Sequence, residues 1–186
     1  MIMLISIAAG LPLPLLPLQL LWLNLVTDGI SGLALAAEKP HKTTLTTPPR
    51  KKSDGILSKK NLIFILSIAG VMVAFTLWMF VWWLERDLVY ARTVAFIFLV
   101  VTQIYNMINL RSLDMSIMRI GFFSNKAITL SVVISMALLL VIIEVESMRN
   151  IFGFAAVSPM MFISLVMISS VVFFAGELLK KAHTVD

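Results

Sequence analysis

The chain alternates between long apolar runs and short polar connectors. The five longest apolar runs cover approximately residues 17–37, 61–84, 91–110, 127–143 and 159–179. Each is close to the roughly 20 residues that an α-helix needs to cross a bilayer. A membrane-spanning barrel would instead show alternating polar and apolar residues, and only helices and barrels satisfy their own backbone hydrogen bonds in lipid. The pattern therefore predicts an all-α, polytopic transmembrane helix bundle with five full spans.

A shorter apolar run, residues 1–10, precedes the five spans. Gly10, Pro12 and Pro14 end it, because proline lacks a backbone donor and disfavours helix at the residue before it. The run has no basic segment in front of it and leads directly into the next span, so it does not fit a signal peptide. We interpret it as the end of a preceding helix, and residues 1–186 as a single membrane domain.

Composition supports a membrane protein and excludes other classes. The chain is 60% hydrophobic and 13% charged, with a mean hydropathy of +0.99. Soluble domains contain about 45–50% apolar and about 25% charged residues. Cysteine is absent, so no disulfide or thiolate metal site is expected. The net charge is +5, but the basic residues lie between the apolar runs, which indicates a bilayer partner and not nucleic acid.

The basic residues are divided unevenly between the two sides of the predicted bundle. Residues 38–60, 111–126 and the C-terminal segment share one side, and they contain seven, three and two Lys or Arg residues. The opposite side contains three, together with four acidic residues. Because basic loops face the cytoplasm, we expect a cytoplasmic loop at 38–60 and a cytoplasmic C-terminus. Glu177, close to Lys180, is expected to be solvated on this side.

The first full span carries a polar cluster near its middle. Asn24, Thr27 and Asp28 are followed by Gly29 and Gly32. With α-helical spacing the three polar residues share one face. A carboxylate at this depth is costly unless it is paired, protonated or bound to a metal. The oxygen donors suit Ca²⁺, Mn²⁺, Mg²⁺ or alkali ions, and the glycines are expected to loosen the helix after Asp28 and free carbonyl ligands.

A second polar stripe lies in the run 91–110. It consists of Thr102, Gln103, Asn106 and Asn109. These side chains can complete an ion shell, with Gln103 and Asn106 as possible further ligands, or they can bond to a neighbouring helix. The helix-bonding role is also open to Thr27. For the cluster around Asp28 we favour a cation site, because intramembrane carboxylates are rarely structural.

The segment "LPLQLLWLNLVTDGISGLALAAE", with "TPPRKKSDGILSKKNL" downstream, resembles the sixth membrane helix and following loop of cation-transporting P-type ATPases. The likeness is greatest to bacterial members of the calcium-pump branch. It covers essentially the whole chain, from the end of the fifth membrane helix through the tenth. The resemblance implies that Asn24, Thr27 and Asp28 coordinate the transported cation, and it favours Ca²⁺ as that cation. It also implies that the protein lies in a bacterial plasma membrane.

The chain departs from the family pattern in two ways. Gln103 falls roughly where two-site calcium pumps carry a glutamate, which weakens the expectation of a second calcium site. The sequence D-K-T-G-T does not occur, so no catalytic residue and no ATPase activity are expected of this chain alone. The resemblance places ATP and Mg²⁺ in the actuator, phosphorylation and nucleotide-binding domains of the pump. Those domains, and the first five helices, would be partners of this chain, which holds no cofactor itself.

Two other functions stay open at this point. The chain fits a stand-alone membrane protein that regulates or associates with a full pump. It also fits a passive ion channel or secondary transporter. Oxygen ligands suit several cations, so the sequence does not decide which cation is carried.

Overall fold

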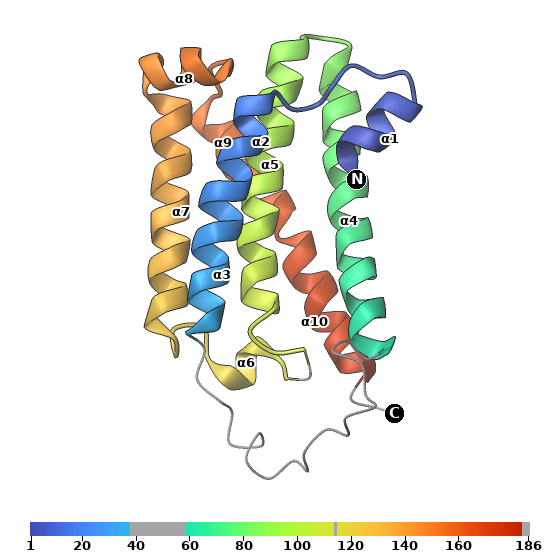
Figure 1. The fold of residues 1–186 in the computed structure, drawn as a ribbon, viewed down its shortest axis with the longest axis vertical. Helices are drawn as coiled ribbons and strands as arrows, with labels where there is room; N and C mark the ends of the chain where they lie inside the picture. The colour runs from blue at the N-terminus through green and yellow to red at the C-terminus, as the bar shows by residue number, and fades with distance from the viewer. Residues whose placement is uncertain (38–58, 114, 184–186) are drawn as a thin grey trace.

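A computed structural model of the chain describes residues 1–37, 59–113 and 115–183. All regular structure in these residues is helical, which confirms the all-α prediction. The five helical segments that are long and apolar enough to cross a membrane are Pro17–Ala36, Asn61–Leu84, Leu88–Asn109, Lys126–Glu144 and Pro159–Lys181. They lie side by side as the predicted bundle (Figure 1). The expected loop at 38–60 falls almost entirely outside the described residues.

The first and last spans are built from more than one helix. The first consists of α2 (Pro17–Trp22), the π-helix η1 (Leu23–Asp28) and α3 (Gly29–Ala36). The last consists of α9 (Pro159–Ser169) and α10 (Val171–His183). The other spans are α4 (Lys59–Leu84), α5 (Leu88–Asn109) and α7 (Lys126–Glu144). Short helices at the ends of the bundle are α1 (Ile2–Ala8), α6 (Ile117–Ile120) and α8 (Glu146–Phe152).

Polar caps and proline set where several spans begin. The Oδ1 of Asn125 accepts hydrogen bonds from the backbone N–H groups of Ala127 and Ile128, at 2.8 and 3.3 Å, and α7 starts at the next residue, Lys126. Helix α9 starts with Pro159, and the Ser158 hydroxyl accepts a backbone N–H of its first turn at 3.2 Å. These caps satisfy donors that have no partner within the first turn of a helix.

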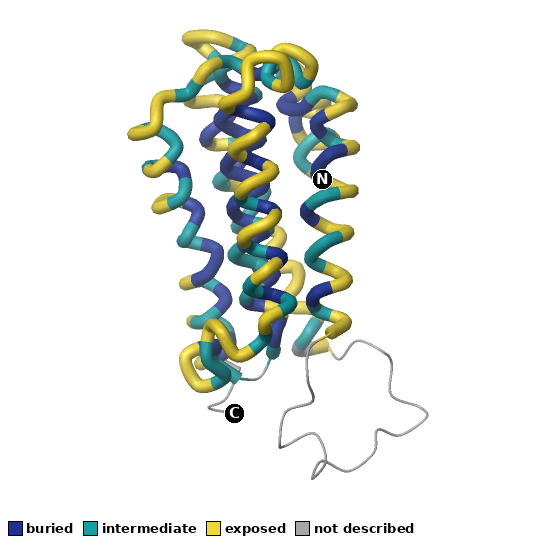
Figure 2. The backbone as a smooth tube through the Cα atoms, turned by 90° about the vertical axis from the view of Figure 1, so that its left-hand side faces the viewer, coloured by how far each residue is buried: buried dark blue, intermediate teal, exposed yellow. Residues whose placement is uncertain are grey.

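Helix α5 is the centre of the bundle. It packs against α4, α7, α9, α10 and η1. In the most apolar 18 residues of α5, 67% of the residues are buried, whereas the corresponding share in the other four spans is 22–33%. Figure 2 shows buried positions along the inside of the bundle and exposed positions along its outer faces. The ring of Phe96 on α5 lies 5.5 Å from that of Trp22 and 4.7 Å from that of Phe154, so α5 holds the first span and the segment before α9 together.

Helices α5 and α10 approach each other closely at Gly176. The Nδ2 of Asn109 donates a hydrogen bond to the Val172 carbonyl at 2.9 Å within this buried contact. A Cβ at position 176 would overlap the Asn109 carboxamide. A small residue here lets a polar side chain of one helix reach the backbone of the other. Asn109 therefore has the helix-bonding role that its sequence pattern left open.

A second polar contact ties α10 to the connector between α5 and α7. The Glu177 carboxylate accepts hydrogen bonds from the Ser116 hydroxyl and from the Ile117 N–H, the latter at 3.2 Å. It also pairs with the Lys180 ammonium at 3.0 Å, and the Lys180 side chain is 1% exposed. The Glu177 side chain is 12% exposed, so the prediction that Glu177 is solvated is wrong. Burial of an ammonium requires such a partner, because an unpaired charge in a low dielectric is costly.

The contact at Gly176 generates a stability prediction. Gly176→Ala is expected to lower the free energy of unfolding by about 1–3 kcal/mol, because the new methyl group must displace the Asn109 amide in a packed interface. Thermal unfolding of the full chain in detergent measures the change. The matched control is Gly70→Ala on α4, where a Cβ meets no atom within 4 Å. Equal stability of the two variants would contradict the close approach of α5 and α10.

Candidate cation site

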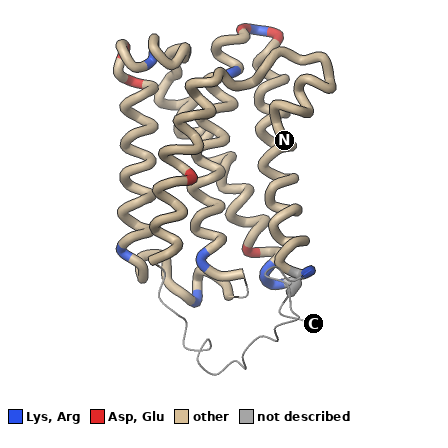
Figure 3. The backbone as a smooth tube through the Cα atoms, in the orientation of Figure 1, with Lys and Arg blue, Asp and Glu red and all other residues tan. Residues whose placement is uncertain are grey.

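Asp28 lies on the outward face of the first span. Figure 3 shows charges gathered at both ends of the bundle and a single acidic position midway along the span that contains η1. Asp28 is the one acidic residue between positions 17 and 36, and its side chain is exposed. Leu25 and Leu33 on the same span are 70% and 77% exposed. A carboxylate thus stands on a surface that is otherwise suited to hydrocarbon.

The π-helix η1 divides the three predicted ligands between two faces. The Gly29 N–H reaches the Asn24 carbonyl, a spacing of five residues in place of four. An α-helix advances about 100° per residue, and the wider π turn advances less. The side chains of Asn24 and Asp28 therefore lie on the same side of the helix, and both residues are exposed. Thr27 lies on the inner side and is 1% exposed. The prediction that all three share one face is wrong for Thr27, because it assumed α-helical spacing.

The departure from α-helical geometry lies before Gly29 and not after it. Gly29 begins the regular helix α3, which continues past Gly32 to Ala36. Within η1 the Thr27 hydroxyl donates to the Leu23 carbonyl at 2.5 Å. The expected loosening after Asp28 is therefore replaced by a π turn that ends at Asp28. In this arrangement Thr27 satisfies a carbonyl of its own helix.

Some polar side-chain atoms of the stripe on α5 have hydrogen-bond partners, and others have none in the described part of the chain. The Thr102 hydroxyl donates to the Leu99 carbonyl at 2.8 Å, and Asn109 is bonded to α10. The Oε1 of Gln103 and the Oδ1 atoms of Asn106 and Asn109 are buried and have no hydrogen-bond partner among the residues that the structure describes. A buried acceptor without a partner costs about 1–3 kcal/mol, and such atoms often mark a place where an ion or water binds. Gln103 and Asn106 are the amides of this group that make no hydrogen bond to another helix within the described residues, and α5 packs against η1 and α3.

The charge of the candidate ligands limits what they can bind. In the described parts of the chain, no group of three or more His, Cys, Asp or Glu side chains lies together. The carboxylate of Asp28 and the amide oxygens of Asn24, Gln103 and Asn106 are hard donors. One carboxylate against a divalent cation leaves a net positive charge, which is unfavourable in a low dielectric. A divalent-cation site built from these residues would need further charged ligands.

Comparison with known proteins gives consistent matches. Residues 12–182 match the family described as "Cation transporting ATPase, C-terminus". The chain is similar to the calcium-transporting ATPase of Bacillus subtilis (strain 168), with 31% identity over 97% of this chain and 21% of that protein. It is 36% identical to the probable cation-transporting ATPase F of Mycobacterium tuberculosis (strain ATCC 25618 / H37Rv), over 71% of this chain and 15% of that protein. The calcium-transporting ATPase type 2C member 2 of Mus musculus is 31% identical over 95% of this chain and 19% of its own length. The chain thus spans about a fifth, or less, of the length of these relatives.

The two kinds of amide on α5 should respond differently to apolar replacement. Gln103→Met is expected to leave the free energy of unfolding unchanged or to raise it by about 1 kcal/mol, because it removes an unpaired buried oxygen. Asn109→Leu is expected to lower it by about 1–3 kcal/mol, because the bond from Nδ2 to the Val172 carbonyl is lost and the close contact at Gly176 is crowded, which outweighs removal of the unpaired Oδ1. Thermal unfolding of both variants in detergent tests this. A loss in Gln103→Met as large as in Asn109→Leu would show that the Gln103 oxygen has a structural partner.

Proposed function

Because this chain belongs to the family of cation-transporting ATPase C-terminal membrane regions, we propose that it forms one wall of the intramembrane cation site of an ATP-driven pump. The observation that carries this proposal is the outward placement of Asn24 and Asp28 at mid-span. A carboxylate at the bilayer centre costs about 2.5–3.5 kcal/mol or more when it stands alone. A cation, and further helices of the pump covering this face, remove that cost.

The proposed site uses the residues of η1 in two arrangements. Asn24 and Asp28 supply an amide oxygen and a carboxylate in the π-helical form. When η1 takes α-helical geometry, Thr27 turns toward the face of Asn24 and Asp28. A change of its rotamer then frees the hydroxyl from the Leu23 carbonyl. A change of helical register within one turn thereby adds or removes a ligand, which is a means of raising and lowering the affinity for the cation. Gln103 and Asn106 on α5 are proposed as further ligands because their oxygens are unpaired.

We propose Ca²⁺ as the transported cation. The donors are carboxylate, amide and hydroxyl oxygens, which Ca²⁺ prefers. Two of the relatives named above are calcium-transporting by their descriptions. The remaining negative charge comes from helices of the pump outside this chain, and ATP and Mg²⁺ bind in its cytoplasmic domains. These parts are the proposed partners, together with the lipid bilayer.

We propose that the ends of α3, α5 and α10 face the cytoplasm. Lys and Arg gather at this end of the bundle in Figure 3, where α4 and α7 also begin. Basic residues are retained on the cytoplasmic side of membrane proteins. The loop after α3 and the C-terminus then lie on the side where the ATP-hydrolysing domains would meet the membrane region.

The role of Asp28 is tested in a chimera. The matching segment of a calcium-transporting relative is replaced by this chain, and Ca²⁺ uptake into inverted membrane vesicles is measured. Asp28→Asn is expected to reduce uptake by at least 100-fold, because it removes the one carboxylate of this wall. The control is Glu146→Gln, which neutralises an exposed acid at the end of the bundle. Uptake by Asp28→Asn that equals the control would refute the proposed site.

The isolated chain is expected to bind Ca²⁺ with a Kd of millimolar or weaker, because one carboxylate does not balance a divalent cation. Isothermal titration calorimetry of the detergent-solubilised chain measures this, with Asp28→Asn as the reference. Micromolar binding that disappears in Asp28→Asn would show a complete site within this chain. Ca²⁺ flux into liposomes that contain only this chain, again lost in Asp28→Asn, would favour a passive channel over part of a pump.

A further inference from the structure

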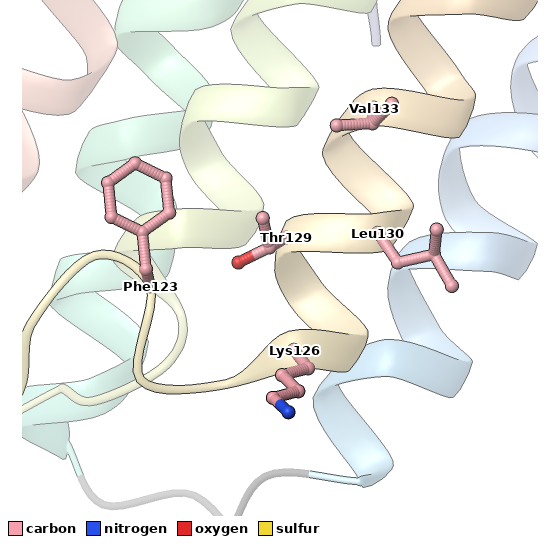
Figure 4. A pocket seen from close by; sticks show the side chains of 5 residues that line it. All are labelled: Phe123, Lys126, Thr129, Leu130 and Val133. Atoms are coloured by element: carbon pink, nitrogen blue, oxygen red, sulfur yellow. The ribbon is translucent and has the colours of Figure 1, made fainter.

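A shallow, open surface cavity of about 390 Å³ lies beside the first turns of α7. Figure 4 shows the side chains that line it: Phe123, Lys126, Thr129, Leu130 and Val133. Four of them follow one edge of α7 at spacings of three and four residues, and Phe123 stands opposite on the preceding loop. The Lys126 side chain points toward the end of the helix, and Val133 lies two turns further into the span. The cavity therefore has a cationic end and an apolar end.

The wall that carries Phe123 is held from behind by a buried arginine. Arg111 is 5% exposed, and its Nη1 donates to the carbonyls of Gly121 and Phe122 at 2.9 and 3.1 Å. Its Nη2 donates to the Ser124 hydroxyl at 2.6 Å. Phe123 lies between these anchored residues with its side chain 81% exposed. Arg111 thus holds the residues on both sides of Phe123, and the Phe123 ring lines the cavity.

The ammonium of Lys126 is the polar group that a ligand would meet. Within the described residues, no carboxylate lies at ion-pair distance from it. The neighbouring polar groups are already used: Asn125 caps α7, and the Thr129 hydroxyl donates to the Asn125 carbonyl at 3.1 Å. The start of α7 adds a positive dipole end to the charge of Lys126. The complementary ligand carries an anionic group attached to a long apolar chain.

We propose that this cavity binds one anionic phospholipid of the adjoining leaflet. Helix α7 is a candidate membrane span, so its first turn lies at the depth of the headgroups. The phosphate meets Lys126, and an acyl chain lies along Leu130 and Val133 beneath Phe123. A basic residue at the cytoplasmic surface of a membrane attracts anionic headgroups by about 1 kcal/mol. The headgroup of a zwitterionic lipid carries a positive group beside its phosphate, so its attraction to Lys126 is weaker. This inference is independent of the proposed cation site.

The test is native mass spectrometry of the full chain, delipidated in detergent and incubated with equal amounts of phosphatidylglycerol and phosphatidylcholine. The wild-type chain is expected to retain one phosphatidylglycerol in preference to phosphatidylcholine. Lys126→Gln is expected to reduce this retention about five-fold, the usual effect of one basic residue at an anionic surface, and Lys126→Arg to preserve it. The matched control is Lys59→Gln, since Lys59 is also an exposed first residue of a long helix at the same end. Its retention should equal that of the wild type.

Several results would overturn the lipid assignment. Equal losses in Lys126→Gln and Lys59→Gln would show a general charge effect without a site at α7. Retention of both lipids alike would remove the role of the anionic headgroup. Displacement of the lipid by inorganic phosphate at equal concentration would identify a site for free anions. A lipid-free dimer that dissociates in Lys126→Gln would identify a second copy of the chain as the occupant.

Discussion

Each backbone N–H and C=O group of a membrane span must find a partner within the protein, because lipid offers none. This constraint explains the form of the first span around Asp28. A local unwinding would leave carbonyls without donors on a face that the rest of this chain does not cover. The π turn keeps its backbone bonded at a spacing of five residues, and the Thr27 hydroxyl adds a second donor to the Leu23 carbonyl. The polar cluster is thus accommodated in a helix that continues across the bundle.

The same requirement divides the polar side chains of the bundle into two groups. Asn109 bonds to the backbone of α10, and Glu177 holds Lys180 and the start of α6. Each of these side chains makes at least one hydrogen bond or ion pair, and together they join α10 to α5 and its connector. Gln103 and Asn106 have unpaired buried oxygens, and Asp28 stands exposed on the outer face. The bonds of Asn109 and Glu177 stabilise the bundle. Gln103, Asn106 and Asp28 make no such bonds to the described parts of the chain, and the proposed cation site therefore rests on these residues.

The sequence predicts the fold class well because a bilayer imposes one length and one type of backbone bonding on every span. The position of Asp28 within a span follows from the same apolar run. The inward turn of Thr27 was not predictable in this way, since the letters of "LNLVTD" carry no signal that distinguishes a π turn from an α turn. The partial burial of Glu177 was also missed, because its partners Ser116 and Ile117 lie 61 and 60 residues away in sequence. Local spacing does not contain such contacts.

The π turn also affects how the chain tolerates changes in length. A turn closed over five residues holds one residue more than an α-helical turn of the same type. Deleting one residue between Leu23 and Asp28 would let η1 become α-helical. Trp22 of α2 would keep its place against Phe96, and α3 its place against α5. A deletion within α5 would rotate everything after it by about 100° and carry its buried face out of the core. The first span therefore contains a spare residue at the point where sequence length can vary without disturbing the bundle.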